Sequence, residues 1–321
     1  MKLQTHIPLA KQSSNLIDYN SSILLLGSCF VENMGDKLSY FKFQNLQNPF
    51  GILFQPKAIE SLISKAINRK EYSETDIFFY NEQWHCFEAH SKLSNPSKEV
   101  LLSNLNHAIK LTNKQIKEST HIIITLGTAW VYRFVESDSV VANCHKVPQK
   151  QFVKELLSVD AITQSLETIV NSICSINKNA DVIFTVSPVR HIKDGFIENT
   201  QSKSHLFTVI HQLINDQLLI GNGQLTYFPS YEIMMDELRD YRFYAEDMVH
   251  PNQLAINYIW EKFQQVWITD ETSKTMDTID SIQKGLRHKP FNPNSRAHKI
   301  FLNELDLKIK KIKKDFSRID F

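Results

Sequence analysis

The sequence predicts an α/β fold in which helices cover both faces of a parallel sheet of five strands. Short runs of β-branched residues or leucine alternate along the chain with segments whose apolar residues recur every three or four positions. The strands are separated by crossovers, which parallel neighbours require. Ligand-binding and catalytic residues are then expected at the carboxyl ends of the strands.

The elements follow in a regular order. The predicted strands are 23–26, 43–46, 121–126, 182–186 and 225–228. The helices between and after them have apolar faces that begin at Phe30, Ile59, Leu101, Ile162, Leu206 and Leu254. Asp160 is the expected cap of the helix at Ile162. Aromatic-rich alternation around polar turns predicts two hairpin insertions, at 76–88 and 130–142.

The composition indicates a globular protein. Hydrophobic residues make up 42% of the 321 residues, charged residues 22%, and glycine only 8 positions, which excludes a disordered or collagen-like chain. The formal charge of +1 indicates no nucleic-acid partner. No apolar run approaches the ~18 residues of a membrane span. The start of the chain lacks the apolar core of a secretory signal, and the four cysteines contain no CxxC pair, so a cytoplasmic location is expected.

The composition changes at Thr269, where lysine, aspartate, asparagine and serine become frequent. We therefore predict a main domain over 1–268 and a helical C-terminal appendage over 269–321. The last stretch spaces Leu305, Ile309, Ile312, Phe316 and Ile319 as on one basic amphipathic helix. Its apolar stripe is expected to pack on its own domain, or to join two copies of the chain in a homo-oligomer.

Ser28 is the first candidate for chemistry. It follows the first strand and opens a helix, where a backbone N–H and the helix dipole favour a negatively charged oxygen. Serine is also common there as a simple cap, so this position leaves both interpretations open. Cys29 would be the nucleophile only if the turn exposed it in place of Ser28.

Asp247 and His250 lie on the loop that follows the fifth strand. A carboxylate three residues before a histidine can orient the imidazole for proton transfer from Ser28. The alternative is a capping aspartate beside an exposed histidine. The rate of such an enzyme should rise through a group that titrates near pH ~6.5.

Arg190 and His191 follow the fourth strand and are expected to bind substrate at the mouth of the site. Arg190 suits a carboxylate or phosphate, and an ion pair that orders the loop is an equal alternative. Cys144 and His145 are adjacent on an extended segment and point to opposite faces, so they are expected to shape a cleft wall and to contact substrate there rather than to form a pair. The histidine spacing predicts no metal site, and we expect no cofactor.

Several motifs occur in a recognisable order. They are Gly27-Ser28-Cys29-Phe30, Asn48-Pro49-Phe50-Gly51, Leu126-Gly127-Thr128-Ala129-Trp130, Asn143-Cys144-His145-Lys146, Ser187-Pro188-Val189-Arg190 and Asp247-Met248-Val249-His250-Pro251. Over about residues 20–265 the chain resembles the GSCFA family, a branch of the SGNH (GDSL-like) hydrolases. The resemblance implies a flavodoxin-like three-layer sandwich. It also implies that Ser28 is the nucleophile, His250 the base and Asp247 its orienter.

The same resemblance implies an oxyanion hole that includes the N–H groups of Ser28 and Gly51. The SGNH pattern would also place asparagine at position 129, where this chain has alanine. Thr128 or Asn48 would have to supply the missing side-chain donor. Losing one such donor can cost on the order of 100-fold in rate.

Together these residues predict a serine esterase that acts on a small-molecule or glycan ester through an acyl-enzyme on Ser28. An O-acyltransferase that passes the acyl group to a glycan hydroxyl would use the same intermediate. A non-catalytic binding module, in which Ser28 only caps its helix, is the alternative from a different class.

Overall fold

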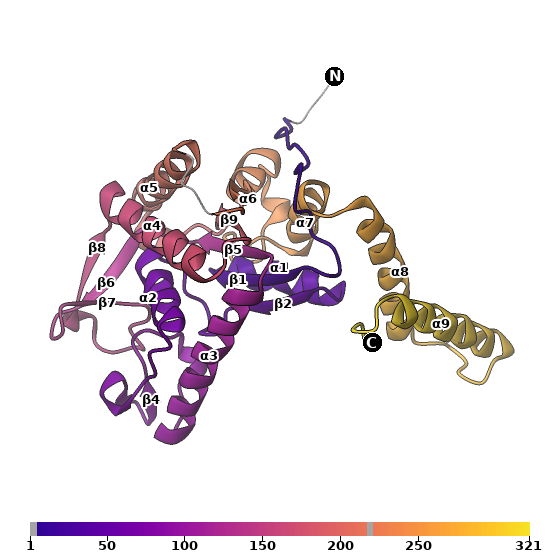
Figure 1. Ribbon diagram of the computed structural model, residues 1–321, viewed down its shortest axis with the longest axis horizontal. Coiled ribbons are helices and arrows are strands. Elements are labelled where there is room, and N and C mark those ends of the chain that lie inside the picture. The colour runs from indigo at the N-terminus through magenta and orange to yellow at the C-terminus, as the bar shows by residue number, and fades with distance from the viewer. Residues whose placement is uncertain (1–4, 217–220) are drawn as a thin grey trace.

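The computed structural model describes residues 5–216 and 221–321 (Figure 1). In this part of the chain, one parallel sheet has the spatial order β10-β9-β5-β1-β2. Its strands are β1 (Ser22–Gly27), β2 (Gln44–Gln47), β5 (His121–Leu126), β9 (Asp181–Val186) and β10 (Leu225–Tyr227). The order of strands reverses beside β1, as in flavodoxin-like folds. The predicted α/β class and the five-stranded parallel sheet are confirmed.

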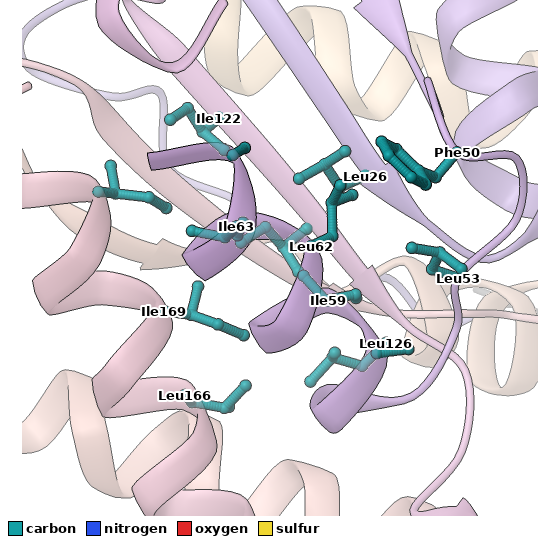
Figure 2. Close-up of a cluster of buried hydrophobic side chains, with 14 of the residues drawn as sticks. Leu26, Phe50, Leu53, Ile59, Leu62, Ile63, Ile122, Leu126, Leu166 and Ile169 are labelled. Carbon is teal, nitrogen blue, oxygen red and sulfur yellow. The ribbon is translucent and has the colours of Figure 1, made fainter. Parts of the chain in front are cut away.

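Each face of the sheet has its own apolar core. On β1, Leu24 and Leu26 belong to one cluster of buried side chains, and Ile23 and Leu25 belong to the other. This alternation follows from the two-residue period of a strand. Figure 2 shows part of the first cluster, in which Leu26 and Leu126 of the strands lie near Ile59 and other side chains of the covering helices.

Helices cover both faces and complete three layers. The first cluster receives side chains from α2 (Pro56–Ile67), α3 (Lys98–Glu118), α4 (Val159–Ile176) and α5 (Phe196–Asn215). The second receives them from α1 (Cys29–Tyr40), α7 (Gln253–Trp267), α8 (Asp270–Arg287) and α9 (Arg296–Asp315). A short helix, α6 (Ser230–Glu232), follows β10.

The start of α4 corrects one prediction. Ser158 is its N-cap, and the Ser158 side chain accepts a hydrogen bond from the backbone N–H of Ala161 at 3.1 Å. Asp160 therefore lies within the first turn, where its charge still complements the helix dipole.

Two antiparallel insertions leave the main sheet. The first is the predicted hairpin of β3 (Phe78–Tyr80) and β4 (Gln83–His85). The second contains β6 (Trp130–Phe134) and β7 (Ser139–Val141), as predicted, and also β8 (Phe152–Leu156), which pairs with β6 and was not predicted. The adjacent charges of Lys154 and Glu155 interrupt the alternation that would have indicated a strand in the sequence.

Helices α8 and α9 extend from one side of the body (Figure 1). The last helix ends at Asp315, so Phe316 and Ile319 lie in the tail after it and not on the helix as predicted. Ile312 and Ile319 are nevertheless buried, and the ring of Phe316 lies 4.9 Å from that of Tyr19. The end of the chain thus packs on its own domain. Among the described residues, no helix combines the length and apolarity that a membrane crossing needs.

Candidate active site

A cavity of about 810 Å³ lies at the carboxyl ends of the central strands. Its wall includes residues that follow β1, β5 and β9 and the loop before α7. Among them are Ser28, Cys29, Thr128, Arg190, His191, Asp247 and His250. The fold therefore brings residues from four distant parts of the chain to the edge where ligands bind in such sheets.

The turn at the end of β1 requires glycine. Gly27 has φ +137°, and a Cβ atom there would lie 2.2 Å from the backbone oxygen of Thr125 on the neighbouring strand. The backbone N–H of Ser28 donates to the same Thr125 oxygen at 3.1 Å. Gly27 thus lets β1 approach β5 closely and fixes the position of Ser28.

Ser28 is the N-cap residue of α1, but its side chain accepts no capping hydrogen bond from the helix. The residue is 2% exposed, and its Oγ atom has no hydrogen-bond partner among the described residues. A buried hydroxyl without a partner is uncommon in folded proteins. The interpretation of Ser28 as a simple cap therefore does not account for its side chain.

The loop of Asp247 and His250 is held in one compact turn. Asp247 Oδ1 accepts the backbone N–H groups of Val249 at 3.0 Å and of His250 at 2.9 Å, and Oδ2 lies 2.5 Å from His250 Nδ1. Met248 between them has φ +57°, a left-handed conformation that is uncommon for such a side chain. These backbone hydrogen bonds, with that of His250 foremost, lower the pKa of Asp247 to about 2. The carboxylate is therefore ionised at neutral pH.

Because Asp247 occupies Nδ1 of His250, Nε2 is the nitrogen left to exchange a proton in the cavity. Ser28 and His250 line the same cavity, although Ser28 Oγ makes no hydrogen bond with the imidazole. Hydrogen bonds between catalytic groups often shorten only when substrate binds. The arrangement has the chemical elements of a nucleophile, a base and an orienting carboxylate.

Arg190 connects two loops of the cavity. Its Nη2 donates to the backbone oxygen of Met248 at 3.3 Å, and its guanidinium lies 5.6 Å from the centre of the Tyr244 ring. Arg190 thus orders a loop through a carbonyl and an aromatic ring. Its Nε is buried without a partner in the part of the chain that the structure describes.

The sequence profile of the GSCFA family matches residues 22–263, which include every residue that lines the cavity. The chain belongs to the GSCFA family. A second profile, for the C-terminal domain of GSCFA domain proteins, matches residues 279–321. No curated protein matches the chain.

Sequence reasoning missed Lys203 of this GSCFA protein. The side chain is 2% exposed, and its Nζ donates to the backbone oxygens of Ser187 at 2.8 Å and Val189 at 3.1 Å. Burial lowers the pKa of Lys203 to about 7. One turn earlier on α5, Asn199 Oδ1 accepts the backbone N–H of His191 at 2.9 Å. These two side chains position the loop after β9.

A signal for Lys203 existed in the sequence. It lies three and seven positions before Leu206 and Ile210, on the apolar face of α5. A lysine on such a face is rarely buried unless it has polar partners. Those partners are backbone oxygens of a distant loop, which no local pattern shows.

Two of the predicted oxyanion donors of the GSCFA protein face a neighbouring hollow. Asn48 and Gly51 line a separate polar depression of about 390 Å³. The N–H of Gly51 donates to the backbone oxygen of Asn48 at 2.7 Å, and Asn48 Oδ1 accepts the N–H of Gly27 at 2.9 Å. In this structure the Gly51 N–H is therefore engaged within its own turn.

Thr128 lines the cavity, but its hydroxyl is also engaged. Its Oγ1 lies 2.8 Å from Ser202 Oγ and accepts the backbone N–H of Trp130 at 3.1 Å. The hydroxyl of Ser202 in turn accepts the N–H of Ala129 at 2.7 Å. These contacts fasten the end of β5 to α5.

Cys144 and His145 are absent from the cavity wall. His145 is buried, and its Nε2 lies 2.7 Å from the backbone oxygen of Cys86. Burial lowers the pKa of His145 to about 4 and raises that of the Cys144 thiol to about 11. Both residues therefore belong to the structure beside the β3–β4 hairpin, which does not fit the predicted contact with substrate.

The Cys29 thiol does line the cavity, but burial and the nearby charge of Glu32 raise its pKa. A raised pKa disfavours the thiolate that a nucleophilic cysteine needs. Within residues 5–216 and 221–321, no three His, Cys, Asp or Glu side chains are grouped so that they could hold a metal ion.

Proposed function

We propose that the protein is a serine esterase of the SGNH type that forms an acyl-enzyme on Ser28. The observation that supports this most is the free, buried hydroxyl of Ser28 in the same cavity as His250, whose Nδ1 is held by Asp247. A hydroxyl, a base and an orienting carboxylate are the parts that nucleophilic acyl transfer needs.

The reaction follows from these positions. Ser28 Oγ attacks the ester carbonyl carbon while His250 Nε2 takes the hydroxyl proton, which gives a tetrahedral oxyanion. The intermediate collapses, the alcohol leaves with the proton from His250, and the acyl group remains on Ser28. Water then attacks the acyl-enzyme, gives a proton to His250, and releases the carboxylic acid as Ser28 regains its proton.

The cavity wall favours a polar, ring-shaped substrate such as a sugar ester. Trp130 and Tyr132 line it together with Arg190. The Trp130 ring is fixed because its Nε1 donates to the backbone oxygen of Glu198 at 3.2 Å and Lys154 Nζ lies 4.7 Å from the ring centre. A rigid aromatic surface with charged neighbours suits a ligand that has both apolar faces and hydroxyl groups.

Transfer of the acyl group to a sugar hydroxyl is the second candidate. The cavity volume of about 810 Å³ leaves room for an acceptor alcohol beside the acyl group. Both reactions share the acyl-enzyme, so they differ only in whether water or an alcohol attacks it. Adding sugars to the acylated enzyme and analysing the products by mass spectrometry would separate them.

The test is reaction with a fluorophosphonate followed by peptide mapping. We expect the label on Ser28 in the wild-type protein and none in Ser28→Ala, which should keep nearly wild-type stability because Ser28 Oγ has no hydrogen bond to lose. Cys29→Ala is the matched control at the adjacent position and should remain labelled. A wild-type protein that does not react would favour the binding module, and ester turnover by Ser28→Ala at the wild-type rate would refute the mechanism.

A further inference from the structure

Three imidazoles line the cavity, those of His90, His191 and His250. Nδ1 of His90 accepts the backbone N–H of Lys92 at 3.2 Å, and the surroundings of the other two rings differ from each other. His250 has a carboxylate on Nδ1, whereas His191 has no carboxylate partner among the described residues. The His191 ring instead lies 5.2 Å from the ring of Phe54. Burial, with the positive charges of Lys203 and His250, lowers the pKa of His191 to about 3. His191 is therefore neutral at neutral pH and has one N–H to donate.

The position of His191 is set by its neighbours. Its backbone N–H is bound by Asn199 Oδ1. A Cβ atom at Gly127 would lie 3.1 Å from His191 Nε2, so this nitrogen lies directly against the residue that follows β5. Strand β5 neighbours β1, with Thr125 in register with Gly27. His191 Nε2 thus lies at the carboxyl end of β5, next to strand β1, which ends at Gly27 just before Ser28.

Other donors at the end of β5 are engaged elsewhere. The N–H groups of Gly127 and Thr128 donate to the backbone oxygen of Phe54 at 2.6 and 3.3 Å. The Ala129 N–H and the Thr128 hydroxyl are bonded to Ser202.

Asn48 and Arg190 are among the described side chains that have a buried N–H without a partner. Asn48 Nδ2 has no partner in the described chain, but Asn48 lines the adjacent hollow and not the cavity. Arg190 lines the cavity, but it is held to the His250 loop through Met248. His191, by contrast, lines the cavity and also lies against Gly127 at the end of β5.

We propose that His191 donates a hydrogen bond from Nε2 to the oxyanion that forms when Ser28 attacks its substrate. This inference rests on the proposed esterase function. As Ser28 Oγ bonds to the carbonyl carbon, the C=O π electrons move to the oxygen, and His191 binds that oxygen without giving up its proton. His250 holds the proton from Ser28 during the same step. The side chain of His191 thereby replaces the asparagine that is absent at position 129.

A neutral imidazole suits this role for a physical reason. It can donate a hydrogen bond to a developing negative charge, but it does not compete with His250 for the proton of Ser28. In other active sites too, two titratable residues take different roles because their environments give them different pKa values. The two histidines would thus divide base and oxyanion donor between them.

The test measures acylation by p-nitrophenyl acetate in the pre-steady state, together with the rate of fluorophosphonate labelling. We expect His191→Phe, which keeps a ring but has no donor, to acylate about 100-fold more slowly than wild type. His191→Gln retains an N–H and should stay within about tenfold of wild type. The midpoint of the pH–rate profile should not change in either variant, because His250 remains the base.

The outcomes separate this inference from the proposed function. A wild-type protein that is not labelled on Ser28 overturns both. If the wild type is labelled, a wild-type rate in His191→Phe, or equal losses in His191→Phe and His191→Gln, overturns the role of His191 alone. Asn48→Asp removes the Nδ2 donor but keeps Oδ1 as the acceptor for Gly27. If this variant acylates more slowly and His191→Phe does not, the oxyanion donor is Asn48 instead. If His191→Phe does not fold, His191→Ala provides the same comparison.

Discussion

Replacing Lys203 by methionine should flatten the pH dependence of folding stability. In the folded protein burial lowers the pKa of Lys203 from 10.5 to about 7. Between these two values the unfolded chain binds more protons at this site than the folded one, so the free energy of unfolding rises with pH. Below the folded pKa both states are protonated, and the penalty for burying the charge is fully present.

The size of the effect follows from the shift. One pKa unit corresponds to about 1.4 kcal/mol, so the Lys203 contribution should add on the order of 2 kcal/mol to the free energy of unfolding between pH 7 and pH 9. Methionine fills a similar volume but leaves the backbone oxygens of Ser187 and Val189 without their donor. The variant should therefore be less stable than wild type at pH 9, by about 1–3 kcal/mol for each oxygen left unpaired.

Urea unfolding at pH 7 and pH 9, followed by tryptophan fluorescence, measures this difference. Lys193→Met is the matched control, because Lys193 is exposed on the same loop and its replacement should keep the wild-type slope. The reasoning would be refuted if Lys203→Met and wild type gained equal stability between the two pH values.

Three further changes test the site and the appendage. Gly27→Ala should destabilise the fold by several kcal/mol or prevent folding, since its Cβ would meet the backbone of Thr125; a melting temperature equal to wild type would contradict this. Asp247→Asn should preserve the fold and slow acylation by at least about 100-fold, with an unchanged rate showing that another group orients His250. Deleting residues 297–321 removes the buried Leu305, Ile312 and Ile319 and should lower the melting temperature, while Ser28 labelling should persist.

The sheet could be predicted because its central strands are buried on both faces. Such strands form continuous apolar runs, and β5 begins and ends where the run 121–126 does. β8 was missed because Lys154 and Glu155, which lie on its opposite faces, are only partly buried and interrupt the apolar alternation. The end of α9 was misplaced because Ile319 continues the helical spacing although it is buried through the tail.

The candidate site was also predictable only in part. The positions of Ser28, Asp247 and His250 after strands were readable from chain order, and the structure places all three in one cavity. The sequence could not predict which N–H groups are free to bind an oxyanion, because this depends on contacts between distant segments. Two such contacts are the hydrogen bond between the Thr128 and Ser202 hydroxyls and the one from the Gly51 N–H to the backbone oxygen of Asn48.

Of the three candidate catalytic residues, Ser28 lies far from Asp247 and His250 in the chain, and this has a consequence during protein synthesis. Ser28 lies on the first strand's turn, whereas Asp247 and His250 follow the last strand of the sheet. A ribosome therefore produces the nucleophile early and its base only after every strand has been made. A chain that is interrupted before Asp247 contains a serine with no partner to activate it. Under the proposed mechanism, acyl transfer begins only when the sheet is complete, so unfinished chains do not react with the esters around them.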